Sequence, residues 1–412
     1  MNFEARNRRR FLFLQGPPGD LFAMVGQRLA ELGHGVHRIN LNGGDEYDWP
    51  VRTTCYRGRP SRWPLFVHDY MEQHRITDIV FYGDCRPVHS AAHGMAKLRG
   101  VAIHVLEEGY IRPDWMTWEP DGVNGHSTLP KDPAWYLAEA KNLPPLPELP
   151  AVTASFGRRA HDSYWHYHRI VTGRWKYPFY KTHRPNWIIG EGLGWLVRFA
   201  RAKRRRRVSA EALERVSGRR YFVFPLQLSA DYQIRIHSPF DTMASAADIL
   251  LGSFARHAPA DTLLLVKDHP LYCGMADWGR VLAAKARRLG IADRLVHVYD
   301  GDLPAMIDAS IGLVCVNSTS ATLALAAGKP VKVLGEAVYD IPGITDQQRL
   351  DSFWSQPKAP QAAIYEAFRR VLHARCLVRG GLASASAVQI LVDGLIERLD
   401  NRVPAAGGAS PR

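Results

Sequence analysis

The 412-residue chain is short of cysteine and of long apolar runs. Its five cysteines are odd in number and no two form a Cys-x-x-Cys pair, which argues against a disulfide framework and a structural zinc site. No stretch approaches about 18 uninterrupted apolar residues, so we expect no membrane-spanning helix. The apolar run 11–14 after the basic N-terminus is too short for a secretory signal and predicts a buried strand. We expect a cytoplasmic protein, either soluble or peripheral to a membrane.

The remaining composition is that of an ordinary globular protein. A hydrophobic fraction of 46% and a charged fraction of 23% exclude a disordered, collagen-like or coiled-coil chain. At about 150 residues per domain, the length favours two large domains. Neither a Walker A sequence nor a G-x-G-x-x-G sequence is present.

Positive charge gathers in one segment. Residues 151–220 hold 17 Lys and Arg against four acids, and this excess equals the net charge of +13 of the whole chain. A surface that coats nucleic acid is more often built from several segments, so this concentration favours a different partner.

Strand and helix patterns alternate in both halves of the chain. Short apolar strands separated by helices of about 10–15 residues are typical of βαβ units with parallel sheets. The first half predicts strands at 11–16, 36–41, 77–84 and 101–109, and helices at 21–33 and 89–100. The second half predicts strands at 220–227, 262–270, 294–300, 311–318 and 330–335, helices at 239–258, 277–290 and 319–329, and a helical segment at 359–400. The loop 42–64 is long, and we expect it near a ligand.

This pattern predicts an α/β fold of two Rossmann-like domains, arranged as in GT-B-like glycosyltransferases with an interdomain cleft. We expect an N-terminal domain at 1–185, a basic and aromatic linker at 186–218, a C-terminal domain with closing helices at 219–400 and a disordered tail at 401–412.

Polar residues follow each predicted strand of the second half. In parallel sheets the carboxyl ends of the strands meet at one edge, where helix N-termini present free N–H groups. Hydroxyl and cationic groups at such an edge suit a nucleotide phosphate. Helix capping alone would explain Ser318 or Thr319 but explains the complete set poorly. We expect a donor nucleotide to contact Gln227, Asp231, Lys267, His269, Asn317, Ser318, Thr319 and Ser320.

Two glutamates end the last predicted strand of the first half. Neighbouring residues of a strand point to opposite faces, so only one of Glu107 and Glu108 should enter a site. A buried carboxylate there would serve as a nucleophile or as an acid/base. Polar and aromatic residues gather just beyond, which favours a site over a solvated loop; they are Arg112, Asp114, Trp115, Glu119, Asn124 and His126.

At these residues the chain resembles the capsule polysaccharide biosynthesis/export proteins of the KpsS/LipB type. The resemblance covers roughly residues 10–375 and includes four motifs in the family's order. They are EEGYIRPDWMTWEPDGVN, QLSADYQI, VKDHP and VNSTSATLALAAGKPVKVLG.

The resemblance implies β-Kdo transfer from CMP-β-Kdo to a phosphatidylglycerol-type lipid at the cytoplasmic face of the inner membrane of a Gram-negative cell. The product would start the poly-Kdo linker of a capsular polysaccharide. A second Kdo transferase and the capsule export machinery are the implied partners, and no metal or other cofactor is expected. Two other interpretations stay open, namely a nucleotide-sugar epimerase of GT-B-like fold and a non-catalytic export component that binds capsule polymer.

The resemblance also assigns roles to residues. Related β-Kdo transferases carry Glu-Asp-Gly where this chain has Glu107, Glu108 and Gly109, so Glu108 takes the acidic position proposed to be catalytic. A β-linked donor that gives a β-linked product implies retention through a covalent adduct on Glu108, with Glu107 or His126 as base for the acceptor hydroxyl. Arg112 and Asn124 would contact substrate.

The basic segment has the composition of an interfacial helix on anionic lipid. Apolar and aromatic residues of 186–199 come just before seven bases within 198–207. A solvated linker and a nucleic-acid patch are the alternatives, but no RNA-binding fold is recognisable and we expect no nucleic acid. The expected membrane-interface residues are Trp187, Trp195, Arg204, Arg205, Arg206 and Arg207.

Overall fold

The structure is a computed structural model that describes residues 8–152, 156–182, 188–228, 232–272 and 277–400. The chain forms two compact units. Unit 1 comprises Met1–Thr128, Pro147–His183 and His373–Arg412, and unit 2 comprises Leu129–Leu146 and Arg184–Leu372. Both are α/β units built on a largely parallel sheet, as the alternating pattern predicts.

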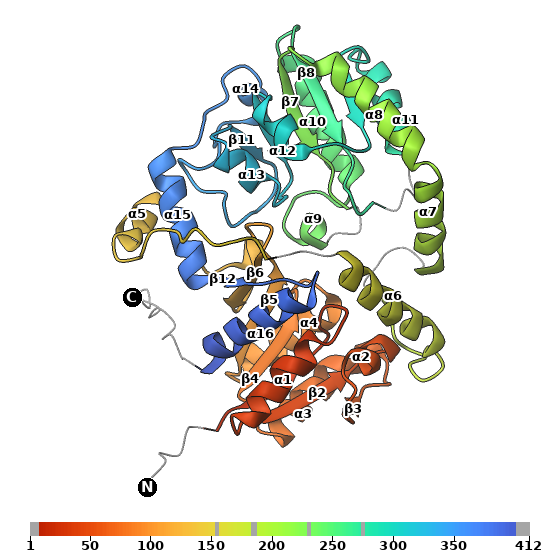
Figure 1. Cartoon of the computed structure of the whole chain (residues 1–412), viewed down its shortest axis with the longest axis vertical. Helices are drawn as coiled ribbons and strands as arrows, with labels where there is room; N and C mark the ends of the chain where they lie inside the picture. Colours follow the sequence, from red (N-terminus) through yellow and green to blue (C-terminus); the bar gives the residue numbers. More distant parts are fainter. Residues whose placement is uncertain (1–7, 153–155, 183–187, 229–231, 273–276, 401–412) are drawn as a thin grey trace. The chain divides into compact units, whose positions relative to one another are not determined.

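Unit 1 contains a seven-stranded sheet in the order β12-β6-β5-β4-β1-β2-β3 (Figure 1). The strands β1 to β5 pair in parallel, whereas β6 and β12 add antiparallel pairs at one side. Their bounds are β1 Arg10–Phe13, β2 Gly35–Asn40, β3 Thr54–Cys55, β4 Asp78–Tyr82, β5 Ala102–Glu108, β6 Trp115–Pro120 and β12 Leu377–Arg379.

The C-terminal helix completes the core of unit 1. Leu391 and Leu395 of α16 are buried in one apolar cluster with Phe13 of β1 and Val25 of α1. Burial of such side chains stabilises by about 1.5–3 kcal/mol each, which holds the end of the chain on the first domain. The described helices of unit 1 are α1 Leu21–Glu31, α2 Gly43–Asp48, η1 Pro60–Arg62, α3 Trp63–Gln73, α4 Pro87–Leu98, η2 Asn124–His126, α6 Phe156–Thr172 and α16 Ala385–Asp400.

Unit 2 contains a five-stranded sheet in the order β11-β10-β7-β8-β9, and all its pairs are parallel. The strands are β7 Tyr221–Pro225, β8 Leu263–Lys267, β9 Leu295–Val298, β10 Gly312–Cys315 and β11 Val331–Val333. Each is nearly all buried, as expected when helices cover both faces. The helices are α5 Pro133–Ala140, α7 Ile188–Ala200, α8 Ala202–Val216, α9 Tyr232–Ile236, α10 Met243–His257, α11 Trp278–Arg288, α12 Leu303–Asp308, α13 Ala321–Ala326, α14 Leu350–Phe353 and α15 Ala362–Arg375.

The chain is divided differently from the expected boundaries. The segment 186–218 was expected to be a linker, but α8 lies on the sheet of unit 2, where Ser209 Oγ accepts hydrogen bonds from the backbone of Tyr299 and Asp300. The closing segment 359–400 splits, because the apolar face of α16 packs in unit 1. The expected loop 42–64 contains the helix α2, capped by Asn42, and the short strand β3. The tail 401–412 lies outside the described residues.

No helix in the described ranges combines the length and the apolar composition that crossing a bilayer requires.

Candidate functional site

Glu108 lies at the carboxyl end of β5 among cationic and phenolic groups. Its Oε1 is 2.6 Å from Nη2 of Arg159, which α6 contributes, and it accepts a 3.3 Å hydrogen bond from the Tyr82 hydroxyl. The side chain of Glu108 is only 20% exposed. Burial favours the neutral acid, but the charges of Arg112 and Arg159 outweigh it and lower the pKa of Glu108 below its usual value. Glu108 is therefore an ionised carboxylate at neutral pH.

Glu107 points to the other face of the sheet, as the alternation of strand side chains predicts. A Cβ added to Gly83 would lie 2.8 Å from Glu107 Oε2, and the φ of Gly83 is +70°. Glu107 Oε1 also accepts a 3.2 Å hydrogen bond from the backbone of Glu108. Glu107 thus packs against the turn after β4. Burial raises the pKa of Tyr82, and the charges of both Glu108 and Glu107 raise it further.

His126 pairs with a carboxylate at the end of β4. Its Nδ1 lies 2.8 Å from Oδ2 of the buried Asp84, and half of the His126 side chain is exposed. When Nδ1–H donates to Asp84, the neutral ring carries its lone pair on Nε2. This is the arrangement of a histidine base oriented by a carboxylate.

A buried carboxylic acid supports the loop that carries His126. Glu119 of β6 is 1% exposed and accepts hydrogen bonds of 2.5 Å from Tyr110 and from Ser127. Burial raises the pKa of Glu119 to about 7 despite these donors. The Tyr110 hydroxyl in turn accepts from the backbone N–H of Asn124, whose φ is +56°. The structure therefore gives the backbone of Asn124 a place in this network.

Arg112 lies close enough to Glu108 to lower its pKa. Its Nε donates a 3.2 Å hydrogen bond to the carbonyl of Gly109, so the guanidinium folds back towards the end of β5. Three residues that contact Glu108 or His126 were not predicted from the sequence, namely Arg159, Tyr82 and Asp84. Tyr82 and Asp84 could have been found, because they lie at the end of a predicted strand. Arg159 could not, because it is one of many bases in its segment.

Three groups of unit 1 have the chemistry of metal ligands. Donor atoms of Asp84, Cys85 and His126 lie within 4.8 Å of one another. The Asp84 carboxylate already accepts from Cys85, His126 and the backbone of Val123, so it serves to hold this loop. The absence of a metal cofactor remains a prediction.

A D-x-D spacing occurs in unit 2 at Asp300 and Asp302. Asp302 caps α12 through the backbone of Ala305, and Asp300 faces Arg206 at 3.5 Å. Both carboxylates thus have local structural partners.

In unit 2 the carboxyl ends of all five strands lie at one edge of the sheet, as predicted. Gln227 and Asn317 form a reciprocal pair there. The Gln227 amide donates 2.8 Å to Asn317 Oδ1 and accepts 3.1 Å from the Asn317 backbone. Both side chains are buried, so they tie the ends of β7 and β10 together.

The cationic residues expected to contact phosphate differ in environment. Lys267 is 6% exposed, and burial lowers its pKa even though Asp300 and Asp268 favour the charged form. His269 is partly exposed and its Nδ1 accepts a 3.0 Å hydrogen bond from the backbone of Leu271. The Nδ1 atom of His269 therefore holds the turn after β8.

The hydroxyl residues before α13 combine capping with partial exposure. Ser318 Oγ accepts from the backbone of Ser320 at 3.2 Å and lies 2.7 Å from its hydroxyl. The Thr319 carbonyl accepts from Thr322. The side chains of Ser318, Thr319 and Ser320 are all partly exposed. Asp231 lies outside the described residues, and nucleotide binding by this set stays a prediction.

The basic segment forms the two helices α7 and α8, and its bases have different surroundings. The Arg205 guanidinium lies 4.8 Å from the ring centre of Tyr299, and Arg206 faces Asp300. Arg204 and Arg207 are exposed. Trp195 packs against Phe199 with ring centres 5.7 Å apart, and Trp187 lies outside the described residues.

The fold is that of an α/β protein with parallel sheets, and the candidate residues gather at the carboxyl ends of its strands. Comparison with known proteins makes this specific. Residues 77–382 match the family model of the capsule polysaccharide biosynthesis protein. The chain is 35% identical over 373 residues to the capsule polysaccharide modification protein LipB of Neisseria meningitidis serogroup A, covering 87% of this chain and 88% of LipB.

Two further proteins are similar. The capsule polysaccharide export protein KpsS of Escherichia coli is 31% identical over 370 residues, covering 88% of this chain and 94% of KpsS. The solved structure of Thermosulfurimonas dismutans KpsC, a beta Kdo 2,7 transferase, matches with a TM-score of 0.44 and 14% identity, covering 93% and 98% of the two chains. The chain belongs to the capsule polysaccharide biosynthesis protein family, which confirms the resemblance seen in its motifs.

Proposed function

We propose that this chain is a retaining β-Kdo transferase of capsule assembly. It takes Kdo from CMP-β-Kdo and places it on a phosphatidylglycerol-type lipid at the cytoplasmic face of the inner membrane. The observation that carries the proposal is the state of Glu108, a carboxylate that Arg159 and Tyr82 hold and that stays ionised although it is largely buried. The family and the relatives named for capsule modification and export support it.

The first proposed step forms a covalent adduct. The Glu108 carboxylate attacks the anomeric carbon of Kdo while the bond to the phosphate oxygen breaks, and CMP leaves with the bonding electron pair. A phosphate is a good leaving group, so departure needs little acid assistance. Attack requires the carboxylate within about 3–3.5 Å of the anomeric carbon.

The second step transfers the sugar to the acceptor. The lipid hydroxyl attacks the anomeric carbon, its proton passes to Nε2 of His126, and Glu108 leaves as a carboxylate. His126 suits this role better than Glu107, because Asp84 orients His126 while Glu107 packs on Gly83. Two inversions give net retention.

The nucleotide is proposed to bind unit 2. Lys267, His269 Nε2 and the hydroxyls of Ser318–Ser320 would contact the phosphate, and the paired Gln227 and Asn317 would keep the strand ends in place. The proposal requires no metal or other cofactor, and it involves a second Kdo transferase and the export machinery only downstream of the product.

The test is incubation of the full chain with CMP-Kdo and a short-chain phosphatidylglycerol-type acceptor, with CMP release and glycolipid followed by mass spectrometry. Both products should form together. CMP release without glycolipid would contradict the transferase. Failure to bind CMP would favour a non-catalytic export component, and interconversion of a nucleotide sugar would favour an epimerase.

A further inference from the structure

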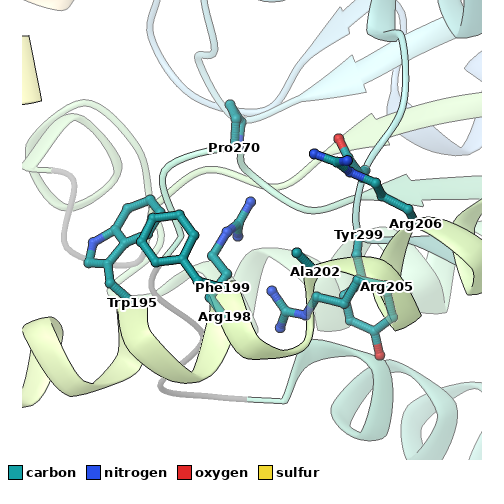
Figure 2. Close-up of a pocket in the computed structure, with 9 residues that line it drawn as sticks. Trp195, Arg198, Phe199, Ala202, Arg205, Arg206, Pro270 and Tyr299 are labelled. Atoms are coloured by element: carbon teal, nitrogen blue, oxygen red, sulfur yellow. The ribbon is translucent and has the colours of Figure 1, made fainter. Parts of the chain in front are cut away.

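A cavity lies between the two helices of the basic segment and the sheet of unit 2. Its volume is about 230 Å³, and the loops after β8 and β9 supply Pro270, Tyr299 and Asp300 as one wall. The other wall consists of Trp195, Arg198, Phe199, Ala202, Arg205 and Arg206. Figure 2 shows the guanidinium groups of Arg198, Arg205 and Arg206 pointing toward the space below Pro270, with Trp195 and Phe199 at one side.

The helical spacing explains why these residues share a wall. Positions 195, 198, 202 and 205 are separated by three or four residues, which places them on one face despite the break at Arg201. Neighbouring positions of α7 form a second stripe, and there Leu193, Leu196 and Phe199 are each more than half exposed. A cationic cavity and an exposed apolar stripe therefore lie side by side on the same helix.

The charges of the cavity are unbalanced. Three arginines line it against one carboxylate, Asp300, and the pair of Arg206 with Asp300 is long at 3.5 Å and mostly exposed. Arg198 Nη1 donates a 2.7 Å hydrogen bond to the Tyr272 carbonyl, which offsets none of the positive charge. Arg205 Nη1 is buried and has no hydrogen-bond partner among the residues that the structure describes. A buried guanidinium nitrogen without a partner is costly, and an anion in the cavity would satisfy it.

We infer that this cavity binds the phosphate headgroup of an anionic membrane lipid, whose acyl chains lie along the exposed apolar stripe of α7. Arginine forks suit phosphate oxygens, and the apolar stripe beside them distinguishes a lipid from a soluble phosphate. The inference rests on the proposed function, in which the acceptor is a phosphatidylglycerol-type lipid, and deepens it by naming a headgroup site. The inference also gives the arginines two different roles. Arg198, Arg205 and Arg206 bind the headgroup, whereas Arg204 and Arg207 attract the anionic membrane surface without binding a particular lipid.

The experiment compares two double variants of the full chain in sedimentation with vesicles of phosphatidylcholine, with and without phosphatidylglycerol. R198Q/R205Q alters the cavity, and R204Q/R207Q removes the same charge from exposed positions of the same segment. Diffuse attraction predicts equal losses, about fivefold per base. A headgroup site predicts that the cavity variant binds phosphatidylglycerol vesicles at least about tenfold more weakly than its control. Equal losses would overturn the inference.

A variant that keeps every charge tests whether the loss of vesicle binding comes from the cavity. Ala202→Phe fills the cavity and leaves every arginine in place, so it should weaken binding to phosphatidylglycerol vesicles by about tenfold and leave binding to phosphatidylcholine unchanged. Wild-type affinity in this variant would contradict a headgroup site. Circular dichroism melting of each variant identifies any that fails to fold.

Two further arms separate the possible ligands. CMP and glycerol 1-phosphate are titrated into the wild type and both double variants without vesicles. If R198Q/R205Q loses CMP binding but matches its control on vesicles, the cavity is a nucleotide site and the inference is wrong. Because vesicle binding needs no donor, a chain that selects phosphatidylglycerol yet transfers no sugar refutes the proposed function and leaves the headgroup site standing.

Discussion

The carboxyl edges of the two sheets use different chemistry. In unit 1 the edge carries paired charges, with Glu108 on Arg159 and Asp84 on His126. In unit 2 the buried tie between strand ends is made by the neutral amides of Gln227 and Asn317, with serine hydroxyls near them, although Asp268 and His297 also form a charged pair at this edge. Charged groups can accept developing charge or protons, whereas neutral amides keep their hydrogen bonds at any ordinary pH. This contrast matches the proposed function, in which the first edge carries the reaction and the second binds the nucleotide.

The largest expected effect comes from removing the reactive charge in unit 1. Glu108→Gln keeps the shape and one acceptor for Arg159, so folding and CMP affinity should stay close to wild type. The rate of sugar transfer should fall by at least about 10³-fold, because the neutral amide cannot attack the anomeric carbon as the carboxylate does. Turnover of CMP-Kdo and CMP titration by calorimetry measure the two quantities.

Glu107→Gln is the matched control for this variant and should retain most activity. If Glu108→Gln keeps substantial turnover, the nucleophile lies elsewhere, and Glu107, Glu119 and Asp231 become the candidates. The proposal that the carboxyl edge of the unit 1 sheet carries the reaction through Glu108 would then be wrong.

The second prediction concerns the buried acid under the unit 1 edge. Glu119 has a folded-state pKa of about 7 against an ordinary value of 4.5. The folded chain holds this proton after the unfolded chain has lost it, so stability falls as pH rises from about 4.5 to 7, by roughly 3 kcal/mol in total. Glu119→Gln should remove the contribution of Glu119 to this slope in urea unfolding measured at several pH values, while the raised pKa of the buried Asp48 contributes in the same direction in both chains.

The control for this variant is Glu31→Gln, which changes an exposed carboxylate of α1. It should leave the slope as in the wild type. Asp78 does not interfere, because Arg9 and His104 overcome its burial and lower its pKa to about 2, which places its own loss of stability at more acidic pH. An unchanged slope in Glu119→Gln would show that another group titrates.

Local sequence patterns predicted most strands of the two sheets but not the antiparallel strands of unit 1. Periodicity and strand-end polarity identified β1, β2, β4, β5 and the whole unit 2 sheet, because buried parallel strands are continuous apolar runs. The antiparallel strand β12 has only three residues, and it pairs with β6 about 260 positions earlier in the chain. The packing of α16 in unit 1 could not be predicted either, because an apolar helical face does not indicate which of two cores it joins.

The same limit applies to the site. Glu108 was predicted from its place at a strand end and from the resemblance, and the structure adds that its opposite charge comes from Arg159, 51 residues away. Nothing in the sequence distinguishes Arg159 from the other bases among the 17 of residues 151–220, so this contact could not be predicted. Long-range pairing is set by packing, which spacing along the chain does not encode.

The third prediction tests the binding edge of unit 2. Lys267→Met fills a buried position without its charge, and His269→Asn keeps a side-chain acceptor for the turn at Leu271. A charge-assisted phosphate contact contributes about 1.5–3 kcal/mol, so each variant should bind CMP about 10- to 100-fold more weakly. Calorimetric titration measures this, and Lys329→Met, outside the proposed contacts, is the control. Normal CMP affinity in both variants would move the nucleotide site away from β8.

The smallest expected effect concerns the support of Glu108 and would sharpen the contrast between the two edges. Arg112 and Arg159 both lower the pKa of Glu108, so Arg159→Gln should raise that pKa, although the charge of Arg112 remains. A nucleophile must be ionised, so a raised pKa of Glu108 should move the acid side of the pH profile of kcat to higher pH, while activity at alkaline pH changes little. Arg158→Gln removes a neighbouring base of α6 that pairs with Asp20 and Asp162, and its profile should match the wild type. A uniform loss of kcat at every pH in Arg159→Gln would mean that Arg159 positions the carboxylate and does not tune its ionisation.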